Sequence, residues 1–171
     1  MSCANQTITG IEKDCSTSKG GINVVYLANY DDVTAVETSE GKITGITLAS
    51  GKTFHTYNFR KGTGSMSSTL NVDPANGVNY VTTDLALTFL KMDTAKRIEM
   101  SALAVNELVA IVKDANGVYW YLGMDEPISA TAGDGTTGSA RSDGNRYSIS
   151  LQDSSSTFPF EVEASVVEGL I

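Results

Sequence analysis

The stretch NYVTTDLALTFLK, residues 79–91, alternates two sets of side chains along its whole length. An extended chain points successive side chains to opposite faces, so a period of two predicts a β-strand. One face carries Val81, Thr83, Leu85, Leu87 and Phe89, and the other carries Tyr80, Thr82, Asp84, Ala86 and Thr88. One long strand is therefore expected here, and a long strand needs partners along its edges, which favours a sheet protein.

Further segments show the same period. Residues Ile22–Tyr30 are apolar on both faces, which predicts a strand that is buried on much of both sides. The segment GKITGITLASGKTFHTYNF predicts a hairpin in which Ile43–Leu48 pairs with Thr53–Phe59 around a turn at Ala49–Lys52. The last two predicted strands are Arg146–Leu151 and Phe158–Val162.

The stretch NELVAIVKDANGVYWYLGM, residues 106–124, consists of two apolar runs joined by a short polar turn. Leu108–Lys113 and Val118–Leu122 are the predicted strands of a β-hairpin, and Asn116 and Gly117 accept the left-handed backbone angles of its turn at low cost.

Three aromatic residues follow one another in the second strand of that hairpin: Tyr119, Trp120 and Tyr121. They bring large apolar area to both faces of the strand, so they are candidate core or interface aromatics. A sugar-binding platform built from the same rings is the alternative, and it requires that the rings be exposed.

One helix is predicted, from about Thr94 to Val105, with Asp93 as its N-cap. Lys96 and Arg97 fall in the first turn, where cations oppose the helix dipole, so the helix is expected to depend on packing against a sheet. The apolar stripe expected to make that contact consists of Ala95, Ile98, Ala102 and Val105.

Two polar, glycine-bearing segments, Arg60–Gly77 and Met124–Asn145, are predicted to be long loops. The whole pattern predicts a mostly β protein, an antiparallel β-sandwich or barrel with one flanking α-helix (about 94–105) and long inter-strand loops. A chain of 171 residues, 41% hydrophobic, has the size of one domain. We assign this domain to residues 20–171 and regard Met1–Lys19 as an N-terminal extension.

The charge excludes several classes of partner. With 12 Lys and Arg against 20 Asp and Glu, the net charge of −8 opposes attraction to nucleic acid phosphates and to anionic membranes. The start MSCANQTITG has neither the basic nor the apolar region of a signal peptide, and no apolar run approaches the roughly 18 residues of a membrane span. A soluble, non-exported chain is expected, with Cys3 and Cys15 as reduced thiols.

The motifs do not favour an enzyme. The single histidine, His55, supports neither a Ser/His/Asp triad nor a histidine-rich metal site. Residues 133–138 match G-x-G-x-x-G, but no helical periodicity follows to hold a pyrophosphate. We therefore predict no catalytic residue, no cofactor and no metal. A glycosidase with two carboxylates from distant parts of the chain is the enzyme alternative that stays open.

Taken in order, several segments resemble the tail tube (major tail) proteins of bacteriophages, in particular those of phages of gut Bacteroidetes. The segments are GGINVVYLANYDDVTAV, TFHTYNFRKGTGS, VTTDLALTFLKMDTAKRIEMSALAVNELVAIVKDANGVYWYLGM and TTGSARSDGNRYSISLQDSSSTFPFEV. They cover most of the chain from about Gly20 to Val162, and the likeness lies in the pattern of strands, helix and turns together with these local phrases.

The resemblance implies a structural virion protein that assembles with itself into six-fold rings, which stack into the tube through which the genome leaves the capsid. It implies assembly in the host bacterial cytoplasm and contacts with other tail proteins, such as the tape measure, the terminator and the baseplate or hub. Genomic DNA would pass through an acidic lumen without specific binding, and no membrane partner is implied. Such proteins have one long loop that reaches the neighbouring ring; Arg60–Gly77 matches it by position, with Lys61, Met66, Leu70 and Val72 as candidate stacking residues.

Two other classes stay open at this point. A capsid-decorating or neck protein would also be a small acidic β-domain, but it would bind a shell instead of stacking on itself. A carbohydrate-binding β-sandwich would use the three neighbouring aromatic residues, and their burial would count against it.

Overall fold

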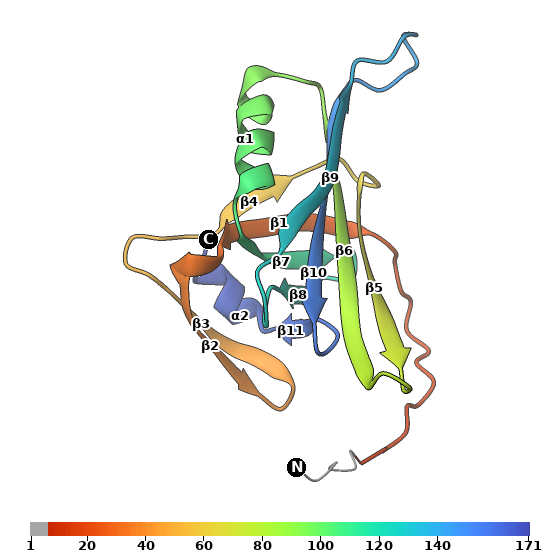
Figure 1. Ribbon diagram of the computed structural model, residues 1–171, viewed down its shortest axis with the longest axis vertical. Coiled ribbons are helices and arrows are strands. Elements are labelled where there is room, and N and C mark those ends of the chain that lie inside the picture. The colour runs from red at the N-terminus through yellow and green to blue at the C-terminus, as the bar shows by residue number, and fades with distance from the viewer. Residues whose placement is uncertain (1–6) are drawn as a thin grey trace.

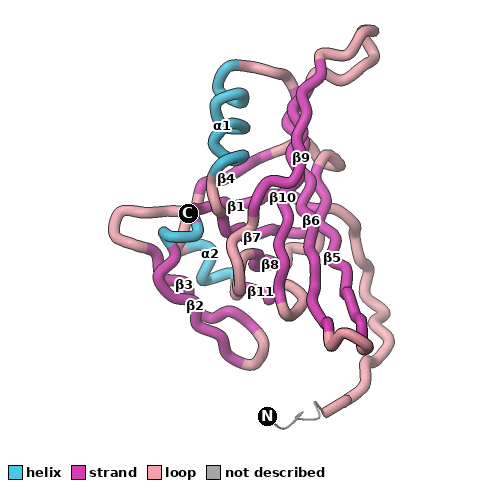
Figure 2. The backbone as a smooth tube through the Cα atoms, viewed as in Figure 1, coloured by secondary structure: helices cyan, strands magenta, loops and turns pink. Residues whose placement is uncertain are grey.

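The computed structural model describes residues 7–171, and within them it contains eleven β-strands, two α-helices and one 3-10 helix (Figures 1 and 2). The strands are β1 (Ile22–Asn29), β2 (Val33–Ser39), β3 (Lys42–Leu48), β4 (His55–Asn58), β5 (Gly64–Asp73), β6 (Val78–Leu90), β7 (Leu108–Asp114), β8 (Tyr119–Leu122), β9 (Ser129–Thr136), β10 (Arg146–Ser155) and β11 (Phe160–Val162). The helices are α1 (Thr94–Val105), α2 (Ala164–Glu168) and the 3-10 turn Tyr30–Asp32.

The strands form two sheets. Sheet A has seven strands in the order β2-β3-β11-β8-β7-β1-β4, and sheet B has four in the order β5-β6-β10-β9. Sheet B is antiparallel throughout, whereas β11 and β3 of sheet A pair in parallel. The strands of the two sheets cross steeply, as in an orthogonal sandwich (Figure 1). The prediction of a mostly β protein with a flanking helix is confirmed.

One hydrophobic core joins the two sheets. It contains the inner residues of β1 and β7 from sheet A and those of β6 and β10 from sheet B, and α1 adds Leu103. Leu85 and Leu87 of the long strand β6 are 0% and 1% exposed, as the alternation predicted. Because the period is two, burial of this row fixes which side chains of sheet B face outward.

A second core lies on the opposite face of sheet A. It gathers Tyr26, Ile43, Ile111 and Tyr121 under α2, which contributes Val167. Strands β1 and β7 are therefore buried on both faces, as predicted for the run that begins at Ile22.

The pairing predicted for the second hairpin is wrong. Strand β3 forms its hairpin with the preceding strand β2, and β4 pairs with β1 at the far edge of sheet A. The turn between β2 and β3 places Glu40 and Gly41 at φ values of 53° and 81°, the left-handed angles that a tight hairpin turn requires. The apolar residues of β2, Val33, Ala35 and Val36, are few and do not alternate, because the register shifts within the strand, so the sequence does not reveal it.

The two predicted long loops are largely strands. Arg60–Gly77 contains β5, and Met124–Asn145 contains β9. Both are outer strands of sheet B and carry mostly polar or small side chains, so they lack the apolar alternation by which strands are recognised. Loops remain only at their ends, chiefly at 137–145.

The predicted bounds of α1 and its N-cap are correct, but the predicted buried stripe is wrong. Asp93 Oδ1 accepts the backbone N–H of Lys96 at 2.8 Å. The helix buries Leu103 and half-buries Met100, while Ile98 and Val105 are 55% and 81% exposed. Ile98 and Val105 thus lie on a part of the helix that this chain does not cover.

The hairpin β7–β8 is confirmed. Gly117 has a φ of 89°, and Asp114 Oδ1 accepts the N–H groups of Asn116 and Val118 at 2.8 and 3.0 Å. The turn also holds the N-terminal segment, because Asn116 Oδ1 accepts the N–H of Lys19 at 2.8 Å.

Residues 7–20, which we call the arm, contain no helix or strand, and all of them are exposed. The arm runs down one side of the molecule past the end of the β5–β6 hairpin (Figure 1). Cys15 is a free, exposed thiol, and Cys3 lies outside the described residues. No helix within residues 7–171 is long and apolar enough to cross a membrane.

A buried carboxyl gives the fold a testable pH dependence. Asp153 on β10 is 3% exposed, and its Oδ1 has no hydrogen-bond partner among the described residues. Burial raises its pKa from 3.8 to about 6, and the nearby charges of Asp125 and Glu126 add to the rise. The ionised form therefore destabilises the fold, with a penalty that starts above pH 3.8 and is complete above about pH 6.

We expect Asp153→Asn to unfold at higher urea than the natural chain at pH 8 and at nearly the same urea at about pH 3.5, below the unfolded-state pKa. A pKa rise of this size corresponds to roughly 3 kcal/mol at most. Asp125→Asn is the control with opposite sign, because the Ser156 N–H donates to this carboxylate at 2.7 Å and lowers its pKa. Equal effects of Asp153→Asn at the two pH values would contradict the assignment.

Candidate assembly surfaces

Sheet B presents a polar face on the side away from the core. The register of the four strands assigns alternate residues to this side, and most carry hydroxyl, amide or carboxylate groups. The residues of the polar face are Ser65, Ser67, Thr69 and Asn71 on β5, Tyr80, Thr82, Asp84, Ala86, Thr88 and Leu90 on β6, Arg146, Ser148, Ser150, Gln152 and Ser154 on β10, and Ser129, Ala132, Asp134 and Thr136 on β9.

Hydrogen bonds between neighbouring strands hold side chains of the polar face in place. Asn71 Nδ2 donates to Thr82 Oγ1 at 3.1 Å, and Gln152 Nε2 donates to Asp84 Oδ1 at 2.9 Å. The only cationic residue in the four strands is Arg146, at one end of β10. The polar face is therefore a flat, hydroxyl-rich surface with a weak negative charge.

Both edges of sheet B are unpaired. Strand β5 pairs only with β6, and β9 pairs only with β10, so each has a row of backbone groups without a strand partner. Natural sheets protect such edges with Lys, Pro or a covering segment. Neither β5, with ten residues, nor β9, with eight residues that include Gly133 and Gly135, contains a Lys or a Pro. These edges are suited to pairing with another chain.

The long axis of sheet B separates charges of opposite sign. Turns and strand ends at one end, which we call the basic end, hold Arg60, Lys61, Lys91, Lys96, Arg97, Arg141 and Arg146, more than half of the chain's 12 Lys and Arg residues. Asp93 and Asp143 at this end already accept hydrogen bonds from backbone N–H groups of α1 and of the loop after β9.

The opposite end, which we call the acidic end, combines carboxylates with exposed apolar side chains. Asp73 closes β5 there, and Asp125 and Glu126 precede β9. The arm, whose sequence includes Glu12, Lys13 and Asp14, runs past this end (Figure 1). The end of the β5–β6 hairpin exposes four apolar residues, which are 37–57% exposed: Leu70, Val72, Val78 and Tyr80.

The candidate stacking residues do not form one loop. Lys61 lies in the turn before β5, at the basic end, whereas Leu70 and Val72 lie at the acidic end. Met66 faces inward and packs on the core beside Leu85. The predicted stacking loop is therefore a strand that runs the length of sheet B, and only Leu70 and Val72 remain exposed apolar contact residues.

The three neighbouring aromatic residues are mainly structural. Tyr121 is 2% exposed in the second core, and Tyr119 packs against the same core with its ring centroid 6.5 Å from that of Tyr26. Trp120 is half-buried on the other face and donates its Nε1–H to Asp114 Oδ2 at 3.0 Å. They do not form an exposed sugar platform.

The carboxylates offer no clear catalytic pair. The pKa of Asp153 is raised and that of Asp125 is lowered, which is the contrast seen in acid–base pairs. Asp153, however, is buried in the core, where it cannot contact a substrate. Within residues 7–171 no cluster of three or more His, Cys, Asp and Glu side chains is arranged to hold a metal ion.

Comparison of the chain with models of protein families, with curated proteins and with solved structures finds no match. The indications of function are therefore the polar face, the unpaired edges and the two charged ends of sheet B.

Sequence reasoning missed the polar face and the two edges of sheet B. One signal was available: residues 65–71 and 146–154 place Ser, Thr, Asn or Gln at nearly every second position. That spacing is the polar half of a strand pattern, and it is easily taken for a loop when the apolar half is short.

We expect alanine substitutions of the candidate stacking residues to differ in their effect on the free energy of unfolding. Met66→Ala should lower the free energy of unfolding by about 1–2 kcal/mol, since it removes partly buried core volume. Leu70→Ala and Val72→Ala should change it by less than about 0.5 kcal/mol in the monomer, because both residues are exposed. Urea unfolding at low protein concentration measures all three, and a large loss for Leu70→Ala would mean that the hairpin end packs on its own chain.

Proposed function

We propose that this chain is a structural virion protein that assembles with itself into stacked rings and so forms the tail tube of a bacteriophage. The observation that carries the proposal is sheet B, a four-stranded sheet with two unprotected edges and an outer face that is polar and almost free of cations. The segment resemblance set out from the sequence supports the same function.

Rings would form by pairing the β5 edge of one copy with the β9 edge of the next. The two edge strands are similar in length, and both are antiparallel to their own neighbours. At a strand spacing of ~4.8 Å, six copies would close a sheet roughly 37 Å across between backbones. Four copies would give only about 24 Å, which inward side chains would narrow further. Six copies leave room for a DNA duplex.

The polar face would line the channel. Asp84 and Asp134 carry its negative charge, Arg146 adds one cation at the basic end, and hydroxyl groups make up most of the remainder. Lys and Arg on such a wall would bind phosphates and hold the DNA. A wall of hydroxyls and carboxylates repels the duplex weakly and lets it slide.

Stacking would join the basic end of one ring to the acidic end of the next. The two ends differ in charge and in shape, so the contact is head-to-tail and repeats without closing on itself. Leu70 and Val72 at the acidic end, together with Ile98 on α1, are exposed apolar groups that such a contact would cover.

The cellular setting follows from the proposed function. Rings would assemble in the cytoplasm of the bacterial host, and tape measure, terminator and baseplate or hub proteins would cap or fill the tube. A capsid-decorating or neck protein is the rival, and self-assembly separates the two.

We expect the purified chain to form rings or hollow tubes over a concentration series, seen by negative-stain microscopy with light-scattering masses on the same samples. Because the proposed stacking is electrostatic in part, tube length should fall as salt rises from 50 to 500 mM. Over this range the electrostatic screening length falls about threefold. A monodisperse monomer at every concentration and salt would overturn the proposal.

A variant and its control localise the ring contact. Ser67→Lys with Thr69→Lys puts two exposed cations on the β5 edge strand and should abolish rings without changing the fold. Thr44→Lys with Thr47→Lys adds the same charge at exposed positions of β3, away from sheet B, and should leave rings intact. If both variants assemble equally well, β5 is not the lateral contact.

A further inference from the structure

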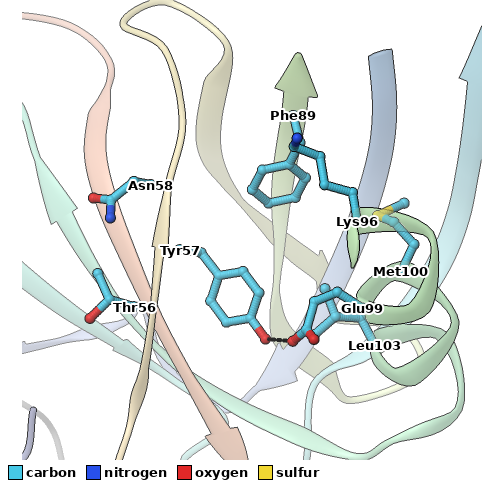
Figure 3. Close-up of a pocket in the computed structure, with 8 residues that line it drawn as sticks. All are labelled: Thr56, Tyr57, Asn58, Phe89, Lys96, Glu99, Met100 and Leu103. Atoms are coloured by element: carbon cyan, nitrogen blue, oxygen red, sulfur yellow. Dashed lines mark hydrogen bonds between the residues drawn. The ribbon is translucent and has the colours of Figure 1, made fainter. Parts of the chain in front are cut away.

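A pocket of about 190 Å³ opens between α1 and the edge strand β4, next to the basic end (Figure 3). Tyr57, Phe89, Met100 and Leu103 form its apolar wall, and Lys96 and Glu99 line its polar side. Small-molecule sites commonly enclose about 300–1,000 Å³, so this pocket is small for a metabolite and suits one aliphatic side chain.

The shape of the pocket is fixed by contacts within the chain. The Tyr57 hydroxyl donates to Glu99 across its floor, and the Tyr57 ring lies 6.3 Å from that of Phe89 between centroids (Figure 3). Leu103 at its base is part of the main core. A preformed pocket loses little conformational entropy when a side chain enters it.

One wall of the pocket is also a free sheet edge. Strand β4 is the last strand of sheet A. Three of its residues line the pocket: Thr56, Tyr57 and Asn58. Within the described residues, no backbone group outside sheet A bonds to β4. A segment that enters the pocket would therefore meet unpaired backbone groups beside it.

The arm supplies an apolar group without a partner. Ile8 is 95% exposed and Ile11 is 102% exposed, more than any other large apolar side chain among the described residues. Glu12 and Asp14 flank Lys13 just after Ile11, and an extended chain points the two carboxylates to one side and Lys13 to the other. The isoleucine matches the apolar wall of the pocket.

Arg97 lies next to Lys96 at the mouth of the pocket. Lys96 already forms an ion pair with Asp93, and Glu99 also lines the pocket, so Arg97 is the main cation that the carboxylates of the arm would meet.

We propose that Ile11 of one copy inserts into the pocket between α1 and β4 of the next copy, with Glu12 and Asp14 facing Lys96 and Arg97. The arm is tied to the body at Lys19, and the eight residue steps from Ile11 to this anchor can span roughly 26 Å when extended. The inference rests on the proposed head-to-tail stacking, because the arm runs past the acidic end, whereas α1, which lines the pocket, begins at the basic end (Figure 1).

Inter-chain cross-linking tests the contact. In a chain with Cys3→Ser and Cys15→Ser, we combine Ile11→Cys with Met100→Cys and oxidise the assembled protein. A ladder of disulfide-linked chains is expected on a non-reducing gel. Ile11→Cys with Ser101→Cys is the matched control, because Ser101 is the exposed next residue of α1 and does not line the pocket. It should cross-link at least about tenfold less.

Microscopy of the same samples separates failure of the contact from failure of the function. Tubes without the ladder assign the pocket to some other ligand and overturn the insertion, while the tube proposal stands. A ladder without tubes supports the insertion and overturns the proposal that the chain forms a tail tube. Monomers without a ladder overturn both, and equal ladders from Met100 and Ser101 overturn the insertion.

Charge reversal gives an independent test without new thiols. Lys96→Glu with Arg97→Glu should weaken association at least about tenfold, measured by sedimentation at low salt. The fold should tolerate the change, because acidic residues in the first turn of a helix favour its dipole.

Adding Glu12→Lys and Asp14→Lys in the same chain should restore association to within about threefold, since the two reversed charges again face opposite charges. Arg146→Glu, at the basic end but outside the pocket, is the control that the arm reversal should not rescue. The local contact would be overturned if the arm reversal rescued Arg146→Glu, or if it failed to rescue the pocket variant.

Discussion

The packing of the inner row of β6 and β10 against β1 and β7 is the contact on which the remaining structure depends. It joins the two sheets, and because side chains alternate along a strand, it also decides what sheet B shows on its other side. A shift of one residue in the register of β6 would bring Asp84 and Ala86 into the core and expose Leu85 and Leu87. The register that buries the core residues of sheet B is therefore also what exposes the polar face.

The sequence revealed those elements whose burial leaves a strong pattern. Strands β1, β6 and β7 were recognised because their apolar residues are numerous and regular, and α1 because Asp93 marks its start. Strands β5 and β9 were missed because an edge strand with a polar outer face has few apolar residues to reveal it. The partner of β3 was wrong because both flanking segments can form a turn, and only tertiary packing selects β2.

The same reasoning explains why the candidate contact residues could be predicted only in part. Leu70 and Val72 were predicted as stacking residues; both are exposed, and their part in stacking stays a prediction. Met66 was grouped with them and faces the same side of β5, but it lies beside Leu85, where the core covers it, whereas Leu70 and Val72 lie nearer the end of the sheet. Ile98 was assigned to the buried face of α1, but the helix rests on Met100 and Leu103 instead. The orientation of a short helix over the open side of a sandwich depends on where the sheets end, and periodicity carries no information on that.

The glycines of β9 have a consequence for how fast such an assembly would form. Gly133 and Gly135 give β9 more conformational freedom to lose on ordering, roughly 0.5–1 kcal/mol each, so β9 is held mainly by β10 until a second strand joins it. The first pairing must then supply the ordering of this edge as well as the contact itself. Later copies join an edge that is already ordered on a growing template. Polymerisation of this kind shows a lag followed by rapid elongation, which keeps free subunits dispersed until a nucleus is present.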